Sequence, residues 1–166
     1  MKVISGGQTG ADRAALEVAR QFGLPTGGWM PRGFLAEDGL HPEFEMLYGM
    51  RETDTADYNE RTARNAFEAD LTLWFGTGDS GGRDWTLFNC QNTGKPYIDL
   101  PLPHPTAKPN EILPRLTGIR TVNVAGHRES VQPGIQALTE AYLTELFQAM
   151  QQAGAQRSED GPDCPT

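Results

Sequence analysis

The chain has 166 residues and a formal net charge of −8, with 37% hydrophobic and 22% charged residues, values typical of one soluble globular domain. This acidic balance excludes non-specific binding to nucleic acid, because no basic stripe is available to neutralise phosphates. No run is long enough for a membrane span or a secretory leader, and Cys90 and Cys164 are too far apart for a metal motif. We therefore expect a cytoplasmic protein that binds neither membranes nor nucleic acid.

The first elements in chain order are a strand, a glycine turn and a helix. Apolar residues predict a strand over 2–5, glycines a loop over 6–10, and helical spacing an amphipathic helix over 12–22 that ends before Gly23. Residues 24–30 predict a second strand. The next expected segments are a functional loop over 31–45, an edge strand or irregular chain over 46–53, and a helix over 58–69 capped by Thr55 or Asp57.

The second half of the chain alternates strands with helices. Residues 71–75 form the clearest buried strand, and a glycine-rich turn over 76–82 follows them. The remaining expected elements are a helix over 84–92, strands over 97–100 and 120–124, a weak helix over 110–116 and a long amphipathic helix over 135–150. This order predicts an α/β fold, a Rossmann-like three-layer sandwich with a mainly parallel sheet and helices on both faces. We expect one ligand-binding domain over 1–153 and a disordered tail over 154–166.

Three glycine-rich turns follow predicted strands, over 6–10, over 76–82 and at Gly126. Ligands of such sheets bind beyond the carboxyl ends of the strands, and backbone N–H groups at the start of a helix can hold an anion. The turns are therefore expected to converge and to bind a phosphate-like group, with valine at Gly7 blocking entry while the fold stays intact. A tight chain reversal is the alternative interpretation, since neither Gly-x-Gly-x-x-Gly nor the Walker lysine is present.

Polar and aromatic residues near the same edge are further candidates. Trp29 is suited to stacking on a flat ring and Arg32 to pairing with a phosphate, although a core tryptophan and a surface arginine are equally simple interpretations. Arg61 and Asn65 share one helix face, from which Asn65 could contact the edge of a heterocycle. The predicted ligand-binding residues are Gly6, Gly7, Gln8, Thr9, Gly10, Asp12, Arg13, Trp29, Met30, Pro31, Arg32, Gly33, Glu37, Asp38, Arg61, Asn65, Gly76, Ser80, Gly81, Gly82, Thr86, Gly126, Arg128 and Glu129.

Four motifs occur in order along the chain, over 5–12, 27–39, 61–65 and 123–130. Together they resemble the molybdenum-cofactor carrier family, which belongs to the Rossmann-like superfamily of the LOG and DprA proteins. The resemblance implies a small α/β domain that forms a dimer or tetramer and holds molybdenum cofactor (molybdopterin) or a nucleotide at its glycine loops. It implies no dedicated metal site.

Three functions stay open. The first is a carrier that does no chemistry, the second is an enzyme acting on a nucleotide or nucleotide-sugar with Glu37, Asp38 or Glu129 as general base, and the third is a nucleotide sensor. The related phosphoribohydrolases carry Pro-Gly-Gly-x-Gly-Thr-x-x-Glu. The residues after Gly82 here lack the third glycine and the glutamate. We therefore assign no catalytic residue.

Overall fold

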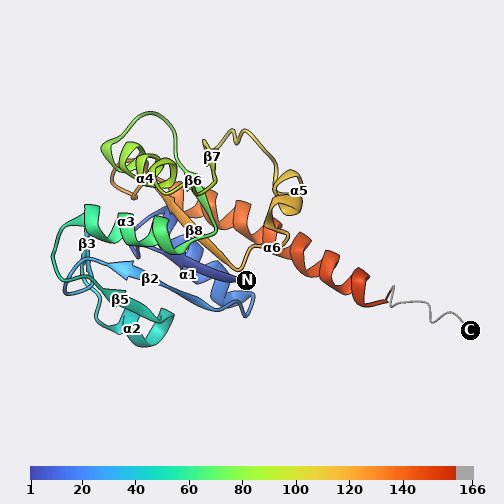
Figure 1. Ribbon diagram of the computed structural model, residues 1–166, viewed down its shortest axis with the longest axis horizontal. Coiled ribbons are helices and arrows are strands. Elements are labelled where there is room, and N and C mark those ends of the chain that lie inside the picture. The colour runs from blue at the N-terminus through green and yellow to red at the C-terminus, as the bar shows by residue number, and fades with distance from the viewer. Residues whose placement is uncertain (160–166) are drawn as a thin grey trace, which may run out of the picture.

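Six parallel strands form the central sheet of the computed structural model, which describes residues 1–159 (Figure 1). They lie in the order β5-β2-β1-β8-β6-β7, and every neighbouring pair is parallel. The α/β prediction is therefore confirmed. The strands are β1 (Lys2–Ser5), β2 (Thr26–Met30), β5 (Met50–Glu52), β6 (Leu71–Phe75), β7 (Tyr97–Leu100) and β8 (Thr121–Gly126).

Helices cover both faces of this sheet (Figure 1). One face carries α1 and α6, with the short α5 beside α6, and the other carries α3 and α4, while α2 packs beside the edge strand β5. Their bounds are α1 (Ala11–Gln21), α2 (Glu43–Tyr48), α3 (Tyr58–Glu68), α4 (Gly81–Asn92), α5 (Pro109–Ile112) with a 3-10 turn over Leu113–Leu116, and α6 (Ile135–Glu159). None of the helices in the described part of the chain is both long and apolar enough to span a membrane.

The strand β6 shows why the sheet is buried on both sides. All five of its residues are buried. Leu71, Leu73 and Phe75 belong to the main core with α1 and α6, so Thr72 and Trp74 project toward the opposite face. A strand covered on both faces has no need of polar residues at every second position.

Three segments differ from the sequence prediction. The expected loop over 31–45 contains a hairpin, β3 (Leu35–Ala36) and β4 (Gly39–Leu40), and the start of α2. Two-residue strands are too short to show alternation of apolar and polar residues, so the hydrophobic pattern of the sequence does not predict them. Helix α4 begins three residues earlier than expected because Ser80 Oγ accepts a hydrogen bond from the Arg83 N–H at 3.1 Å. Helix α6 continues through 154–159, where a tail was expected; residues 160–166 lie outside the described part.

Candidate functional site

The three glycine-rich turns meet at one edge of the sheet, because β1, β8 and β6 are neighbours and all three turns follow their carboxyl ends. A cavity of about 340 Å³ lies there, between these turns and the first residues of α3 and α4. Its walls are formed by Gln8, Tyr58, Asn59, Arg61, Thr62, Trp74, Ser80, Gly81, Gly82, Trp85, Gly126, His127, Arg128 and Val131. A groove of about 510 Å³ between α5 and α6 lies elsewhere, beside Leu102 and Tyr142.

The side chains that line this cavity differ from the acidic chain as a whole. Arg61 and Arg128 line it, and no carboxylate does, although the chain carries a net charge of −8. Their carboxylate partners, Asp12 and Glu37, lie outside the wall. The cavity therefore presents guanidinium groups to a ligand while the carboxylates that pair with them do not line it.

Arg61 is held in the wall of the cavity by the buried carboxylate of Asp12. The Arg61 Nη1 atom lies 3.1 Å from Asp12 Oδ2, and the two side chains are 13% and 2% exposed. Burial raises the pKa of Asp12, while Arg61 and the backbone N–H groups of Gln8 and Gly126 favour its charged form. Asp12 thus ties together α1, α3 and two of the glycine turns.

The amino-terminal end of α4 is open to the cavity. Gly81 and Gly82 have exposed backbone, and no atom lies within 4 Å of the position that a Cβ atom on Gly81 would take. The first N–H groups of a helix have no partner within the helix and carry partial positive charge. The start of α4 thus leaves space in the same cavity as Arg61 and Arg128, and binding of an anion there stays a prediction.

The amino-terminal end of α1 is closed by the protein itself. A Cβ atom on Gly7 would lie 2.5 Å from the Met30 sulfur, and one on Gly10 would lie 2.4 Å from the His127 carbonyl oxygen. The Ala11 N–H donates to that same carbonyl at 3.1 Å. These glycines permit close packing of the chain against itself, so the expectation that valine at Gly7 would leave the fold intact is wrong. Loop 6–10 contributes Gln8 to the cavity wall.

Several predicted residues lie away from the cavity. Asn65 is 2% exposed, and its amide bonds to the backbone of Ser5 and Trp29, so it joins β1 to β2. The Trp29 ring lies against the guanidinium groups of Arg51 and Arg64, 4.0 and 4.5 Å from its centroid. The Thr86 hydroxyl donates to the Gly82 carbonyl within α4. Also outside the wall are Gly6, Met30, Pro31, Gly33 and Gly76, which belong to strand ends and turns, and the exposed Arg32. Thr9, Arg13, Glu37, Asp38 and Glu129 lie outside it too.

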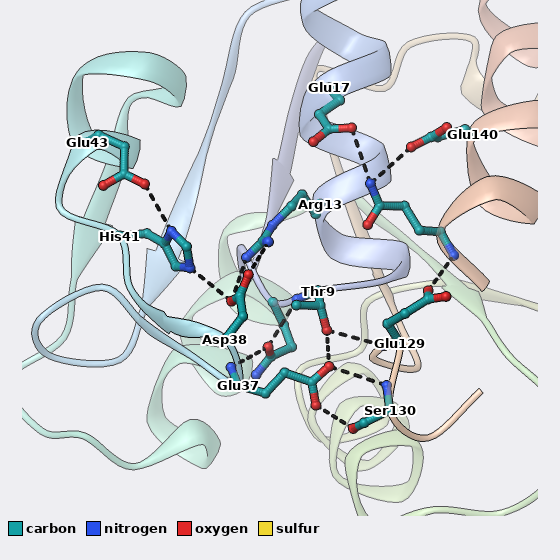
Figure 2. A network of polar contacts seen from close by, with 12 residues as sticks. Thr9, Arg13, Glu17, Glu37, Asp38, His41, Glu43, Glu129, Ser130 and Glu140 are labelled. Carbon is teal, nitrogen blue, oxygen red and sulfur yellow. Dashed lines mark hydrogen bonds and ion pairs between the residues drawn. The ribbon is translucent and has the colours of Figure 1, made fainter. Parts of the chain in front are cut away.

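Glu37 joins the β3–β4 hairpin to two of the loops at the sheet edge (Figure 2). Its carboxylate accepts hydrogen bonds from the hydroxyls of Thr9 and Ser130 and lies 3.4 Å from Arg128 Nε. Its backbone N–H donates to Gln8 Oε1 at 2.8 Å. Burial raises the pKa of Glu37, but the hydrogen bonds from Ser130 and Thr9 outweigh burial and the pKa is lowered. The hairpin thus orients Gln8 and Arg128, two residues of the cavity wall.

The other two candidate bases also serve the fold. Asp38 accepts two hydrogen bonds from Arg13, at 2.6 and 3.1 Å, and one from His41 (Figure 2); the Arg13 contacts lower its pKa. Glu129 accepts hydrogen bonds from the backbone N–H groups of Gly134 and Gln136 at the start of α6. A general base needs a free oxygen and a pKa near neutrality. Both oxygens of each of these carboxylates already accept hydrogen bonds within the protein.

We expect acid to release the β3–β4 hairpin. The pKa values of Glu37 and Asp38 are lowered in the folded protein. Their contacts therefore stabilise the hairpin fully above about pH 4, and this stabilisation is lost progressively as the pH falls from there through the lowered pKa values. Amide NMR spectra recorded from pH 6 down to about pH 2 would show resonances of the hairpin shifting before those of β6. A Glu37→Gln variant should lose part of this response. Hairpin resonances that stay unchanged until those of β6 also shift would contradict it.

Several wall residues, among them Tyr58, Trp85 and His127, lie outside the set of predicted ligand-binding residues. One signal was available: Tyr58 and Arg61 are three positions apart and therefore lie on the same face of α3. Trp85 carried no such signal, since its place depends on how α3 and α4 pack. Its indole N–H donates to the Asn59 carbonyl at 3.0 Å. In the described residues, no group of three or more His, Cys, Asp or Glu side chains is arranged to hold a metal ion.

A family model, the circularly permutated YpsA SLOG family, matches residues 3–147. The chain belongs to this family. SLOG proteins fit the LOG-like superfamily expected from the four motifs, so that prediction is confirmed. The matched SLOG segment includes every residue of the cavity wall.

One solved structure agrees with this assignment to the SLOG family. A crystal structure from Syntrophus aciditrophicus SB, named as a proposed molybdenum carrier protein, is 35% identical over 88% of this chain and 93% of that chain, with a TM-score of 0.76. A second, (E)-4-hydroxy-3-methyl-but-2-enyl diphosphate reductase, is 14% identical over 87% of this chain and 59% of that chain, with a TM-score of 0.36. This second similarity carries no argument about fold or function. No curated protein matches the chain.

Proposed function

We propose that this protein binds a small phosphate-bearing ligand with a flat ring, of the molybdopterin or nucleotide type, and carries it without catalysing a reaction. The observation that supports the proposal best is the cavity that combines Arg61, Arg128 and the open amino-terminal end of α4. A phosphate would accept hydrogen bonds from the N–H groups of Gly81 and Gly82 and pair with the two guanidinium groups.

The remaining walls suit a flat ring. Tyr58 and Trp85 line the cavity, and Trp85 is braced by Phe88, with 5.5 Å between the ring centroids and 19° between the planes. Aromatic side chains favour stacked or edge-to-face contact with another ring system. The volume of about 340 Å³ is at the lower end of the range of about 300–1,000 Å³ for small-molecule pockets. A ligand with one ring system and one phosphate fits this volume better than a dinucleotide.

The role of a molybdenum-cofactor carrier is supported by the name of the Syntrophus relative. It is also supported by the three candidate carboxylates at the sheet edge, Glu37, Asp38 and Glu129, which are occupied by contacts within the protein. The cofactor's own chemistry would be molybdenum redox chemistry in a recipient enzyme, and this chain would bind, orient and shield it. We further propose a cytoplasmic homo-oligomer, which light scattering after size exclusion would test.

Titration of the purified protein with isolated molybdopterin under anaerobic conditions, and with AMP and GMP, tests the proposal. We expect saturable binding with one ligand per subunit, no product, and slower oxidation of bound molybdopterin. Product formation from a nucleotide would favour the enzyme hypothesis. A change in oligomeric state on binding, without product, would favour the sensor hypothesis.

Replacing Arg128 with glutamine should weaken binding selectively. Its side chain is 47% exposed and its ion pair with Glu37 is long, so the melting temperature should hardly change. Loss of a charged hydrogen bond to the ligand should reduce affinity by about 1–3 kcal/mol. Calorimetric titration with AMP measures this, and Arg32→Gln, which alters an exposed arginine outside the wall, is the control. Equal affinity of the two variants would remove Arg128 from the site.

A further inference from the structure

His127 has one ring nitrogen fixed by the protein. It follows β8, is 5% exposed and lines the cavity. Its Nε2 lies 2.9 Å from the Thr77 carbonyl oxygen, and its ring meets Trp74 edge to face at 5.7 Å and 83°. A Cβ atom on Gly76 would lie 2.3 Å from its Cδ2. The imidazole is therefore held in one orientation by contacts on several sides.

These contacts determine which ring nitrogen of His127 can gain or lose a proton. A carbonyl oxygen only accepts hydrogen bonds, so Nε2 carries hydrogen in both the neutral and the charged ring. Nδ1 of His127 is then the atom that gains or loses a proton, and no residue in the described part of the chain bonds to it. The neutral ring offers an acceptor at Nδ1, and the charged ring offers a donor with positive charge.

A protonated His127 would have no negatively charged partner within the part of the protein that the structure describes. Arg61 from α3 and Arg128 from the same loop share the cavity with it, and both are positive. The carboxylates on the elements packed against it already have partners: Asp12 of α1 with Arg61, Asp79 of the 76–80 turn with Arg83 of α4, and Glu129 with the start of α6. An anionic ligand in the cavity would supply the missing negative charge.

We infer that His127 contacts the ligand and that its protonation strengthens the binding of an anion in this cavity. The inference rests on the proposed function and adds pH control to the same site. Histidine is the side chain that changes charge between about pH 5 and 8, and a hydrogen bond from a charged donor is stronger than one from a neutral donor. By linkage, affinity is highest at the acidic end of this interval and falls as the pH rises, because the bound anion favours the protonated ring.

Calorimetric titrations with AMP and with sulfate at pH 5.5 and pH 8 test the inference. Sulfate keeps a constant charge over this range, so its pH dependence reports on the protein. We expect the wild type to bind sulfate about tenfold more tightly at pH 5.5 than at pH 8. His127→Gln, which keeps an N–H for Thr77 and cannot gain charge, should lose most of this difference. His104→Gln, which alters an exposed histidine outside the cavity wall, should behave like the wild type.

A spectroscopic measurement on the wild type covers the case in which His127→Gln does not fold. At pH 7, addition of AMP should move the ¹⁵N shifts of His127 toward those of a charged imidazolium and leave those of His104 unchanged. Unmoved His127 shifts, or equal pH dependence of sulfate binding in the wild type and His127→Gln, would overturn the inference. The proposed function would still stand in that case if Arg128→Gln weakens AMP binding. No binding of AMP or sulfate at any pH would overturn both.

Discussion

Replacing Arg61 with glutamine is expected to destabilise the protein and abolish ligand binding together. The change leaves Asp12, 2% exposed, without its cationic partner. Removal of one member of a buried ion pair typically costs about 3–5 kcal/mol, because the remaining charge is buried and unpaired. Burial already raises the pKa of Asp12, so the variant should lose more stability at neutral pH than at pH 4, where protonation of Asp12 removes the charge.

The double variant Asp12→Asn with Arg61→Gln separates the two effects. Asparagine carries no charge and can still accept a hydrogen bond from the Gln8 or Gly126 N–H. Stability, measured by urea unfolding, should therefore recover to within about 1–2 kcal/mol of the wild type, while affinity for AMP stays at least tenfold lower. Full binding by the stable double variant would show that Arg61 has only a structural role.

The substitution of Gly126 by alanine is expected to prevent folding. A Cβ atom there would lie 2.2 Å from the Phe75 carbonyl oxygen and 2.6 Å from the Ala11 Cβ. Both are parts of packed elements that cannot move independently, so the cost should exceed about 3 kcal/mol. Gly81→Ala is the matched control, since nothing lies within 4 Å of the added atom. It should leave the free energy of unfolding unchanged or raise it slightly, because alanine favours a helix.

Soluble expression and thermal unfolding followed by circular dichroism would test both predictions, for Gly126→Ala and for Gly81→Ala. A folded Gly126→Ala protein with a melting temperature near that of the wild type would show that the turn after β8 can open. The close packing described for the sheet edge would then be wrong. An unstable Gly81→Ala protein would instead show that the start of α4 is tightly packed, contrary to an open anion-binding end.

The sequence was informative where local chemistry decides structure. The strand over 71–75 and the helix over 12–22 with Gly23 after it were predicted to within one residue, because apolar spacing and a left-handed glycine are local signals. The convergence of the three glycine turns followed from the parallel topology alone. The β3–β4 hairpin was not predictable, because it is held by Glu37 and Asp38 through contacts with distant parts of the chain.

The different roles of the glycines could be recognised only from the three-dimensional structure. In the sequence, Gly7 and Gly81 both stand in turns before helices and suggest equal access for a ligand. In the structure, Met30 occupies the space beside Gly7 while the space beside Gly81 is empty. Similarly, the polar Asn65 and the aromatic Trp85 both stand on helices and are both plausible ligand contacts in the sequence. Only Trp85 reaches the cavity. Such differences arise from packing between elements and leave no trace in local spacing.

The central claim is that the open end of α4, together with Arg61 and Arg128, holds the anionic group of a small ligand. A crystal structure of the protein with AMP or anaerobically prepared molybdopterin tests it most directly. The account predicts phosphate density within hydrogen-bond distance of the Gly81 and Gly82 N–H groups and beside both guanidinium groups. Phosphate bound instead at the start of α1 beside Gly7, or ligand seated only in the groove between α5 and α6, would contradict it.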